Sequence, residues 1–330
     1  MSSIDVIFTK HRPVLLVLFF LLGFGSLFTG LLFGSVSVPF SEIVQALLFS
    51  ADSSVHQIVW QLRVPRVLAA FACGGLLALA GALLQVLLRN PLADPYILGV
   101  SGGAAVGALL AMLLGWGIVW VNLTSLAGAL AVVALVFGLS FRAGDWNLYR
   151  LLLTGVVLSA GCTALITLIL TLAPAGDVKG MLFWLMGDVS RAEELLPAWA
   201  VLIVVMAMSM LFSSSLNVLS LGQIKAKTLG VAVLPLQLGI YFCASLATVA
   251  ALILAGAIGF VGLIVPHVVR LLGVHDFRWL LPLSVLLGGS FLTLADTLAR
   301  TLWAPQQLPV GVLTALLGVP MLLILLSRKQ

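Results

Sequence analysis

Long apolar stretches separated by isolated charges constrain this chain more than any other feature. Hydrophobic residues make up 62% of the 330 positions and charged residues only 8%, whereas an ordinary soluble domain carries about 25% charged residues. Side chains of this composition cannot cover a surface that faces water. The sequence therefore predicts a protein whose solvent is a lipid bilayer, in which helices satisfy their own backbone polar groups.

Ten of these stretches suit a membrane-spanning helix, which needs roughly 20 mainly apolar residues. We predict an all-α, polytopic fold in one transmembrane domain over residues 1–330, with spans at 14–34, 65–88, 96–115, 118–140, 150–172, 194–213, 234–254, 257–272, 279–299 and 309–327. The boundaries of the eighth span stay open, because three glycines and Pro266 interrupt it. Gly99, Gly103 and Gly107 recur at a spacing of four, which predicts close helix packing.

The basic residues indicate which side of the membrane each loop occupies, because cytoplasmic loops are enriched in Lys and Arg. Most of the 16 Lys and Arg residues fall on one side if the N-terminus is cytoplasmic. An even number of spans then puts both termini inside. The polar segment 214–233 is accordingly predicted to be a cytoplasmic loop, and the connections 35–64 and 173–193 are the longest ones outside.

The sequence lacks the residue patterns of an enzyme. It contains no HExxH, no G-x-S-x-G and no ATP-binding G-x-x-x-x-G-K-[ST]. Cys73, Cys162 and Cys243 stand alone in apolar stretches, so we predict that they are buried hydrophobes. We expect no catalytic residue, no metal site and no bound cofactor. The basic residues form no run, which argues against nucleic-acid binding.

Asp296 alone among the acidic residues lies inside a predicted span. Ion-coupled carriers place several ionisable groups at membrane depth, and Asp296 has Arg300 one helical turn later, which predicts a local ion pair. The energy for transport is therefore expected from a partner. Two other classes stay open on these grounds: an ion-gradient-driven secondary transporter or channel that acts without an ATPase, and a membrane scaffold.

The inner loop 214–233 contains a patterned segment. Gly222 and Gly230 bracket a short helical turn that has apolar side chains on one side and two lysines on the other. A short amphipathic helix of this kind fits a groove in a partner protein, although a solvated or lipid-facing loop is the alternative. Its residues of interest are Leu219, Leu221, Gly222, Ile224, Lys225, Ala226, Lys227, Leu229 and Gly230.

Three arginines mark the opposite side of the membrane. Arg63 and Arg66 enter the second span, and Arg300 leaves the ninth. Guanidinium groups form bidentate pairs with carboxylates, so this edge could receive acidic residues of a partner. The alternative is that the three side chains extend to lipid headgroups.

Several motifs together resemble the permease subunits of the iron-chelate and vitamin B12 family of ATP-binding-cassette (ABC) importers. The resemblance covers about residue 60 to the C-terminus, with every motif in the family's order. The motifs are 63–66 (RVPR), 81–95 (GALLQVLLRNPLADP), 98–103 (LGVSGG), 219–230 (LSLGQIKAKTLG), 256–270 (GAIGFVGLIVPHVVR), 295–300 (ADTLAR) and 308–311 (LPVG).

This resemblance implies a ten-span permease of a bacterial inner membrane. It implies a homodimer that pairs with two ATPase subunits, which use ATP and Mg, and with a periplasmic binding protein. Segment 219–230 then contacts the ATPase, and the three arginines receive acids of the binding protein. The segment 178–187 resembles the short outer helix that borders the translocation path, where the apolar side chains are Met181, Phe183, Trp184 and Met186.

The inner gate departs from the vitamin B12 branch of that family. The branch tends to carry small hydroxyl residues before the fifth span, where this sequence has Asn147, Leu148 and Tyr149. A larger and less polar gate is expected. The resemblance implies a bulky metal chelate as cargo, and it leaves ferric siderophore, haem and cobalamin open.

Overall fold

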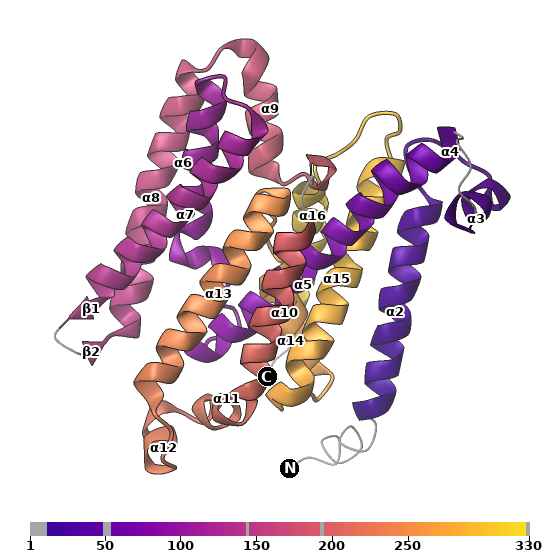
Figure 1. Cartoon of the computed structure of the whole chain (residues 1–330). Coiled ribbons are helices and arrows are strands. Elements are labelled where there is room, and N and C mark those ends of the chain that lie inside the picture. The colour runs from indigo at the N-terminus through magenta and orange to yellow at the C-terminus, as the bar shows by residue number, and fades with distance from the viewer. Residues whose placement is uncertain (1–11, 49–53, 143–144, 192–194, 328–330) are drawn as a thin grey trace.

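The computed structural model describes residues 12–48, 54–142, 145–191 and 195–327, and these form an elongated bundle of helices (Figure 1). Two two-residue strands pair antiparallel, with Phe141 opposite Trp146. The elements are α2 (Arg12–Leu32), α3 (Phe40–Leu48), α4 (Ser54–Gln57), the π-helix η1 (Ile58–Arg63), α5 (Val64–Leu87), the 3-10 helix η2 (Pro95–Leu98), α6 (Val100–Leu113), α7 (Ile118–Ser140), β1 (Phe141–Arg142), β2 (Asp145–Trp146), α8 (Leu148–Leu172), α9 (Ala175–Met186), the 3-10 helix η3 (Val189–Arg191), α10 (Leu195–Leu211), α11 (Ser213–Ser220), α12 (Gln223–Thr228), α13 (Val233–Ala255), α14 (Val261–Leu271), α15 (Phe277–Thr301) and α16 (Val310–Ser327).

Each of the ten predicted spans matches one helix of the described chain, and α3, α4, α9, α11 and α12 lie in the connections. Six of the matching helices are long and apolar enough to cross a membrane, and α10 is a further one, from which α11 bends away by 65°. Three shorter apolar helices, α6, α14 and α16, account for the rest. The all-α prediction is confirmed. The first residue of the predicted span 194–213 lies outside the described residues.

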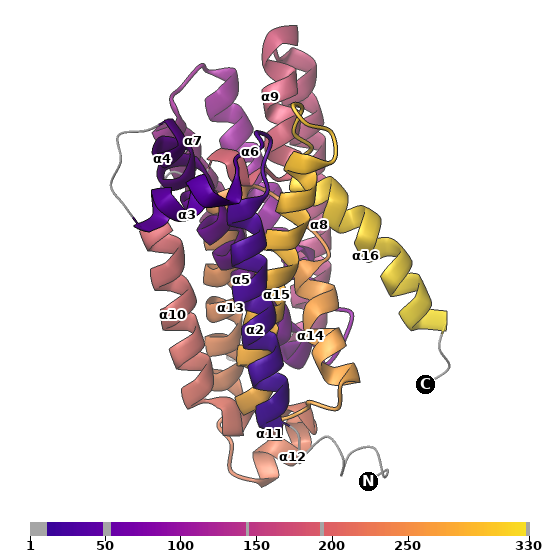
Figure 2. The ribbon, with the colours of Figure 1, turned by 90° about the vertical axis from the view of Figure 1, so that its right-hand side faces the viewer.

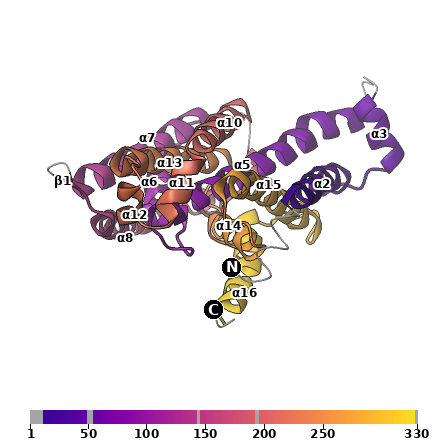
Figure 3. The ribbon, with the colours of Figure 1, turned by 90° about the horizontal axis from the view of Figure 1, so that it is seen from below.

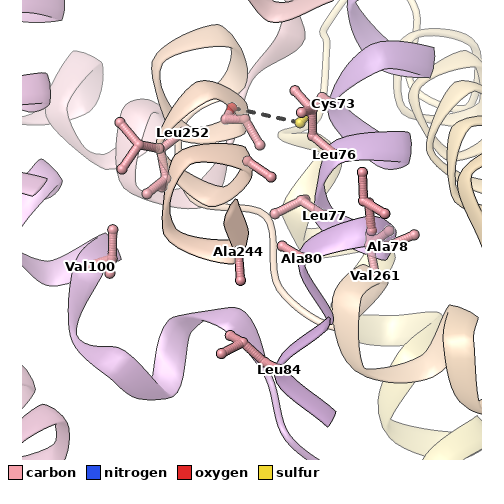
Figure 4. Packing of buried hydrophobic residues seen from close by; sticks show 14 of the residues in the cluster. Cys73, Leu76, Leu77, Ala78, Ala80, Leu84, Val100, Ala244, Leu252 and Val261 are labelled. Carbon is pink, nitrogen blue, oxygen red and sulfur yellow. Dashed lines mark hydrogen bonds between the residues drawn. The ribbon is translucent and has the colours of Figure 1, made fainter. Parts of the chain in front are cut away.

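Helix α5 is the centre of the bundle. Together with α4 and η1 it forms a continuous helical stretch, Ser54–Leu87. In the most apolar 18 residues of this stretch, 94% of the positions are buried inside the protein. Figure 4 shows Leu76 and Leu77 of α5 beside Ala244 and Leu252 of α13, in a cluster that extends to α6 and α14. Helices α2, α10, α13, α14 and α15 pack around α5, so most of its apolar side chains contact protein rather than lipid.

The cysteines are packed as the sequence predicts. Cys73 and Cys162 are buried, and Cys243 is half-buried, with none in a disulfide among the described residues. The Cys73 thiol donates weakly to the Ala251 carbonyl of α13, with sulfur and oxygen 3.7 Å apart (Figure 4). These thiols act as small apolar side chains.

Glycines bring helices close together where lipid provides no hydrophobic driving force for association. A Cβ added to Gly103 of α6 would lie 2.4 Å from the carbonyl oxygen of Gly128 in α7. One added to Gly107 would lie 2.0 Å from the Thr124 carbonyl. The predicted close packing is confirmed for these two positions, whereas Gly99 instead adopts φ +76° just before α6.

The predicted spans 96–115 and 257–272 are shorter as helices than expected. Helix α6 has 14 residues, about 21 Å at 1.5 Å per residue, which is less than the roughly 30 Å of the hydrocarbon core. Both α6 and α14 follow irregular segments that meet beside α5: Tyr96 Oη accepts a hydrogen bond from Ile258 N at 3.0 Å. The span 96–115 therefore combines most of the 3-10 helix η2 with α6, and the span 257–272 combines a short irregular segment with α14.

A glutamine of α5 supports the broken span of α14. Pro266 has no N–H, so the Gly262 carbonyl loses its helical donor. Gln85 Nε2 donates to the carbonyls of Leu263 at 3.0 Å and Gly262 at 3.4 Å, and Arg270 donates to Gln85 Oε1. These bonds attach α14 to α5 at a point where the backbone could not satisfy itself.

Candidate functional site

Two of the three arginines, Arg66 and Arg300, contact Asp296 at one end of the bundle. Arg66 of α5 donates from Nε and Nη2 to both carboxylate oxygens of Asp296 in α15, at 2.9–3.1 Å. Its Nη1 donates to Gln307 Oε1 at 2.6 Å. The Asp296 side chain is 1% exposed and that of Arg66 is 12% exposed. The main partner of Asp296 therefore comes from a helix 230 positions away in the sequence.

Arg300 is shared between Asp296 and the end of α2. Its Nε lies 3.5 Å from Asp296 Oδ2, so the predicted local ion pair is present, although the Nε has no hydrogen-bond partner among the described residues. Its Nη2 donates to the Gly30 carbonyl at 2.6 Å. One guanidinium thus joins α15 to α2.

Arg63 also binds the end of α2. Its Nη1 donates to the carbonyls of Leu31 at 2.7 Å and Leu32 at 2.9 Å, and its Nη2 donates to the Val36 carbonyl at 2.6 Å. The last carbonyls of a helix lack intrahelical donors and carry partial negative charge. Arg63 therefore caps α2.

The three arginines differ in what they offer a partner. Arg63 and Arg300 are 4% and 3% exposed, and their guanidinium groups are bound to the backbone of α2. Arg66 is the one of the three with an accessible edge. The residues predicted to dock a binding protein thus lie at the same end of the bundle, with Arg63 and Arg300 buried and Arg66 partly exposed.

The segment predicted to contact an ATPase lies at the opposite end of the bundle (Figure 1). The short helix predicted between Gly222 and Gly230 is α12, and α11 precedes it. Gly222 separates the two helices with φ +116°, a conformation that residues with a Cβ rarely adopt. Ile224 is 82% exposed, and Leu221 and Leu229 are also exposed. Lys225 and Lys227 are exposed too, whereas Leu219 and Ala226 are buried in the fold.

Side-chain bonds attach α11 to the start of α15. Asn217 Nδ2 donates to Asp276 Oδ1 at 2.7 Å, and Asn217 Oδ1 accepts from Phe277 N at 2.9 Å. Arg278 Nη2 donates to Ser214 Oγ at 2.8 Å. These bonds join α11, the helix that precedes α12, to the start of α15, which carries Asp296 near its other end.

The four apolar side chains predicted to border a path do not share one face of α9. Met181 and Trp184 are buried against the rest of the chain, because the inner side of α9 packs on the bundle. Phe183 is half-buried and Met186 is exposed. The helix itself lies where the segment 178–187 predicts it.

Met186 contributes to an apolar hollow of about 560 Å³ between the end of α9, the segment before α14, and α16. Ala257, Gly311 and Val319 are among the other lining residues. Figure 2 shows α16 leaving the bundle as it descends from this region. The hollow is therefore open on the side where α16 diverges.

The predicted gate residues begin α8 at the same end as α12 (Figure 1). Asn147 caps the helix, because its Oδ1 accepts from Tyr149 N at 2.9 Å and Arg150 N at 3.2 Å. The Tyr149 side chain is exposed and Leu148 is half-buried. A bulky aromatic group thus projects beside the first turn of α8.

Comparison with known proteins decides the family. Residues 16–328 match the FecCD transport family. The chain belongs to that family. This FecCD chain is 37% identical over 326 residues to the uncharacterized ABC transporter permease protein YvrB of Bacillus subtilis, with 92% of the chain and 91% of YvrB covered. It is 39% identical over 279 residues to the vitamin B12 import system permease protein BtuC of Klebsiella pneumoniae, with 82% and 83% covered.

Solved structures resemble the FecCD chain in fold. An inward-facing transporter assigned to the metal-chelate type of ABC transporters superposes with a TM-score of 0.84 at 32% identity, covering 96% of this chain and 100% of that one. PsaBC from Streptococcus pneumoniae superposes with a TM-score of 0.51 at 15% identity. At 15% identity, the similarity to PsaBC shows a shared fold and says nothing about function.

Family membership confirms the resemblance drawn from the motifs. The FecCD chain is a multi-pass membrane permease of a bacterial ABC importer of the metal-chelate and vitamin B12 class. It is the non-catalytic subunit, and an ATPase and a binding protein are its partners. The alternatives of an ion-gradient-driven carrier and of a membrane scaffold are thereby set aside.

Proposed function

We propose that two copies of this chain form the membrane part of an importer for a bulky metal chelate of the ferric siderophore, haem or cobalamin type. A periplasmic binding protein delivers the chelate at the end that carries the arginines. Two ATPase subunits bind α11 and α12 at the cytoplasmic end and drive the cycle. Both termini are cytoplasmic in this arrangement, in agreement with the distribution of Lys and Arg.

The apolar hollow between α9, α16 and the segment before α14 carries this proposal. Its volume of about 560 Å³ lies in the roughly 300–1,000 Å³ range of small-molecule pockets, and one copy encloses it on one side only. A second copy would close it into a path. Apolar walls accept a large ligand by shape and leave the selection of cargo to the binding protein.

The surfaces of α8 and α16 support a homodimer. Leu153, Val157 and Leu168 of α8 are exposed, as are Leu316 and Leu323 of α16. Seen from below, α8, α14 and α16 lie on one side of the molecule, with α7 and α10 on the other (Figure 3). A partner copy on the first side would bury these side chains and face the hollow.

For the delivery step, Arg66 is the first contact for a carboxylate of the binding protein. The cluster holds three guanidinium groups and one carboxylate, and charge complementarity guides such encounters. An incoming carboxylate competes with Asp296 for Arg66. Arg63 and Arg300 join the interface once α2 shifts, because their donors are bound to its carbonyls.

Reconstitution in proteoliposomes tests the proposed function. The permease, its ATPase and its binding protein are combined, and uptake of labelled ferric siderophore, haem and cobalamin is measured with ATP inside or absent. Uptake should require all three proteins and ATP, and native mass measurement should give two permeases for two ATPases. Uptake by the permease alone, or a complex with one permease copy, would refute the proposal.

A further inference from the structure

Helix α5 ends on an arginine whose backbone has a conformation that usually belongs to glycine. Asn90 N donates to the Gln85 carbonyl at 3.1 Å, and Arg89 N donates to the Val86 carbonyl at 3.4 Å. These two bonds form a Schellman motif, whose left-handed residue is usually Gly. Here that residue is Arg89, with φ +51°. A Cβ is disfavoured in this region, so the backbone gives no reason for an arginine at this position.

The same motif ends three other helices of the described chain, and there it uses glycine. Helices α6, α12 and α14 have the same pair of bonds, with Gly115, Gly230 and Gly273 as the left-handed residues. Glycine adopts this conformation without a steric cost. The contrast within one chain indicates that Arg89 makes a side-chain contact that glycine could not make.

That contact is with the turn between α11 and α12. The Arg89 atoms Nη2, Cζ and Nη1 lie 3.5, 3.7 and 3.9 Å from the position that a Cβ of Gly222 would take. The guanidinium therefore packs on the bare backbone of this turn. Gly222 comes directly after the end of α11, where helix carbonyls carry partial negative charge that favours a cation.

Helix α5 is a firm support for the turn, and α12 is not firmly held by itself. Most residues of α5 are buried, and it packs against α10, α13, α14 and α15. Its 24 residues extend over about 36 Å at 1.5 Å per residue, from the Arg66 end to the Arg89 end. Helix α12 has six residues, of which Ala226 is buried, and it packs on α11 and α13. The position of α12 therefore depends on the turn at its start.

We propose that Arg89 is a positioning residue, which holds the α11–α12 turn against the end of α5 and so fixes the orientation in which α12 meets the ATPase. This inference rests on the proposed contact of α12 with the ATPase. When the ATPase displaces α12, the displacement reaches α5 instead of being absorbed by the turn. Without the guanidinium, α12 still meets the ATPase but moves independently of α5.

Hydrogen exchange of the purified full chain measures how firmly the turn is held. Arg89→Gly removes the guanidinium and leaves a residue that adopts φ +51° freely, so the midpoint of unfolding should stay the same or rise. Arg89→Asn also tolerates this conformation, and it separates loss of the guanidinium from the added freedom of glycine. Both variants should speed exchange of the hydrogen-bonded amides of Ala226, Leu229 and Val231 about tenfold.

Arg150→Ala is the control for hydrogen exchange, because Arg150 is another exposed arginine at the same end of the bundle (Figure 1). It should leave the exchange of these α12 amides as in the wild type. Unchanged exchange in both Arg89 variants would overturn the positioning role.

ATP hydrolysis by the assembled permease, ATPase and binding protein tests the role in coupling. Stimulation of hydrolysis by added binding protein is measured without cargo, so the result does not depend on which chelate is carried. In Arg89→Gly and Arg89→Asn the ATPase should still co-purify with the permease, but the stimulation should fall about fivefold. Full stimulation in both variants would overturn the inference. An ATPase that still co-purifies with Ile224→Asp would instead refute the underlying contact at α12.

Discussion

Neutralising Asp296 should destabilise the permease more than any other single loss of charge at this end of the bundle. The Asp296→Asn change leaves the side-chain shape nearly intact but removes the carboxylate that Arg66 and Arg300 share. The guanidinium groups of Arg63, Arg66 and Arg300 would then lie together without a carboxylate between them.

The magnitude follows from the burial of this carboxylate. Asp296 is 1% exposed, and removing one partner of a buried ion pair costs about 3–5 kcal/mol. Arg66→Gln should cost less, about 1.5–3 kcal/mol as for hydrogen bonds to charged groups, because Asp296 keeps Arg300. Since the two residues contact each other, the double variant should cost about 1–3 kcal/mol less than the sum.

Reversible unfolding of the purified permease in mixed micelles, followed by tryptophan fluorescence, measures these free energies. Asp177→Asn on α9 is the control, because this acid is exposed and should change stability by less than about 0.5 kcal/mol. A loss below about 1 kcal/mol for Asp296→Asn, or strict additivity in the double variant, would show that the cluster does not hold the helices together.

Two further variants address the partner surfaces. Arg66→Ala should weaken the binding of the purified binding protein about tenfold at low salt, and by less at high salt. Surface plasmon resonance measures the affinity, with Lys179→Ala as the control. An equal loss of affinity at all salt concentrations would contradict an electrostatic contact. Ile224→Asp should abolish ATP-driven uptake by preventing association with the ATPase. Co-purification and uptake are measured against Lys179→Gln, an exposed position outside this segment, and normal uptake in Ile224→Asp would exclude α12 from the contact.

Span positions could be predicted because length and apolar character are local properties. Each of the ten predicted segments contains a helix, with ends that agree within a few residues in the long spans such as Leu148–Leu172. The shortness of α6 and α14 could not be predicted from hydropathy. The residues at the start of the two predicted spans, 96–99 and 257–260, are as apolar as the helices that follow them. Pro266 and the glycines before α14 were the available signal.

Contacts between distant segments could not be predicted. The ion pair of Asp296 with Arg300 could be predicted, because the two residues are four positions apart on one helix. The hydrogen-bonded pair of Asp296 with Arg66 could not, because it depends on how α5 packs against α15. Helices α3 and α4 in the connection 35–64 were also missed. Their signal was the apolar pair Ile43 and Ala46, spaced by three and both buried.

Polar side chains form hydrogen bonds between helices at a few places in this structure. Some helices are bonded to their neighbours in this way, and others are not. Arg66 joins α5 to α15, Gln85 joins α5 to α14, and Asn217 joins α11 to α15. By contrast, Thr163, Thr167 and Thr171 of α8 donate to carbonyls of their own helix, which satisfies them without a neighbour. The joined helices α5, α11, α14 and α15 connect the two ends of the bundle, and in the proposed homodimer the self-satisfied face of α8 would meet the second copy.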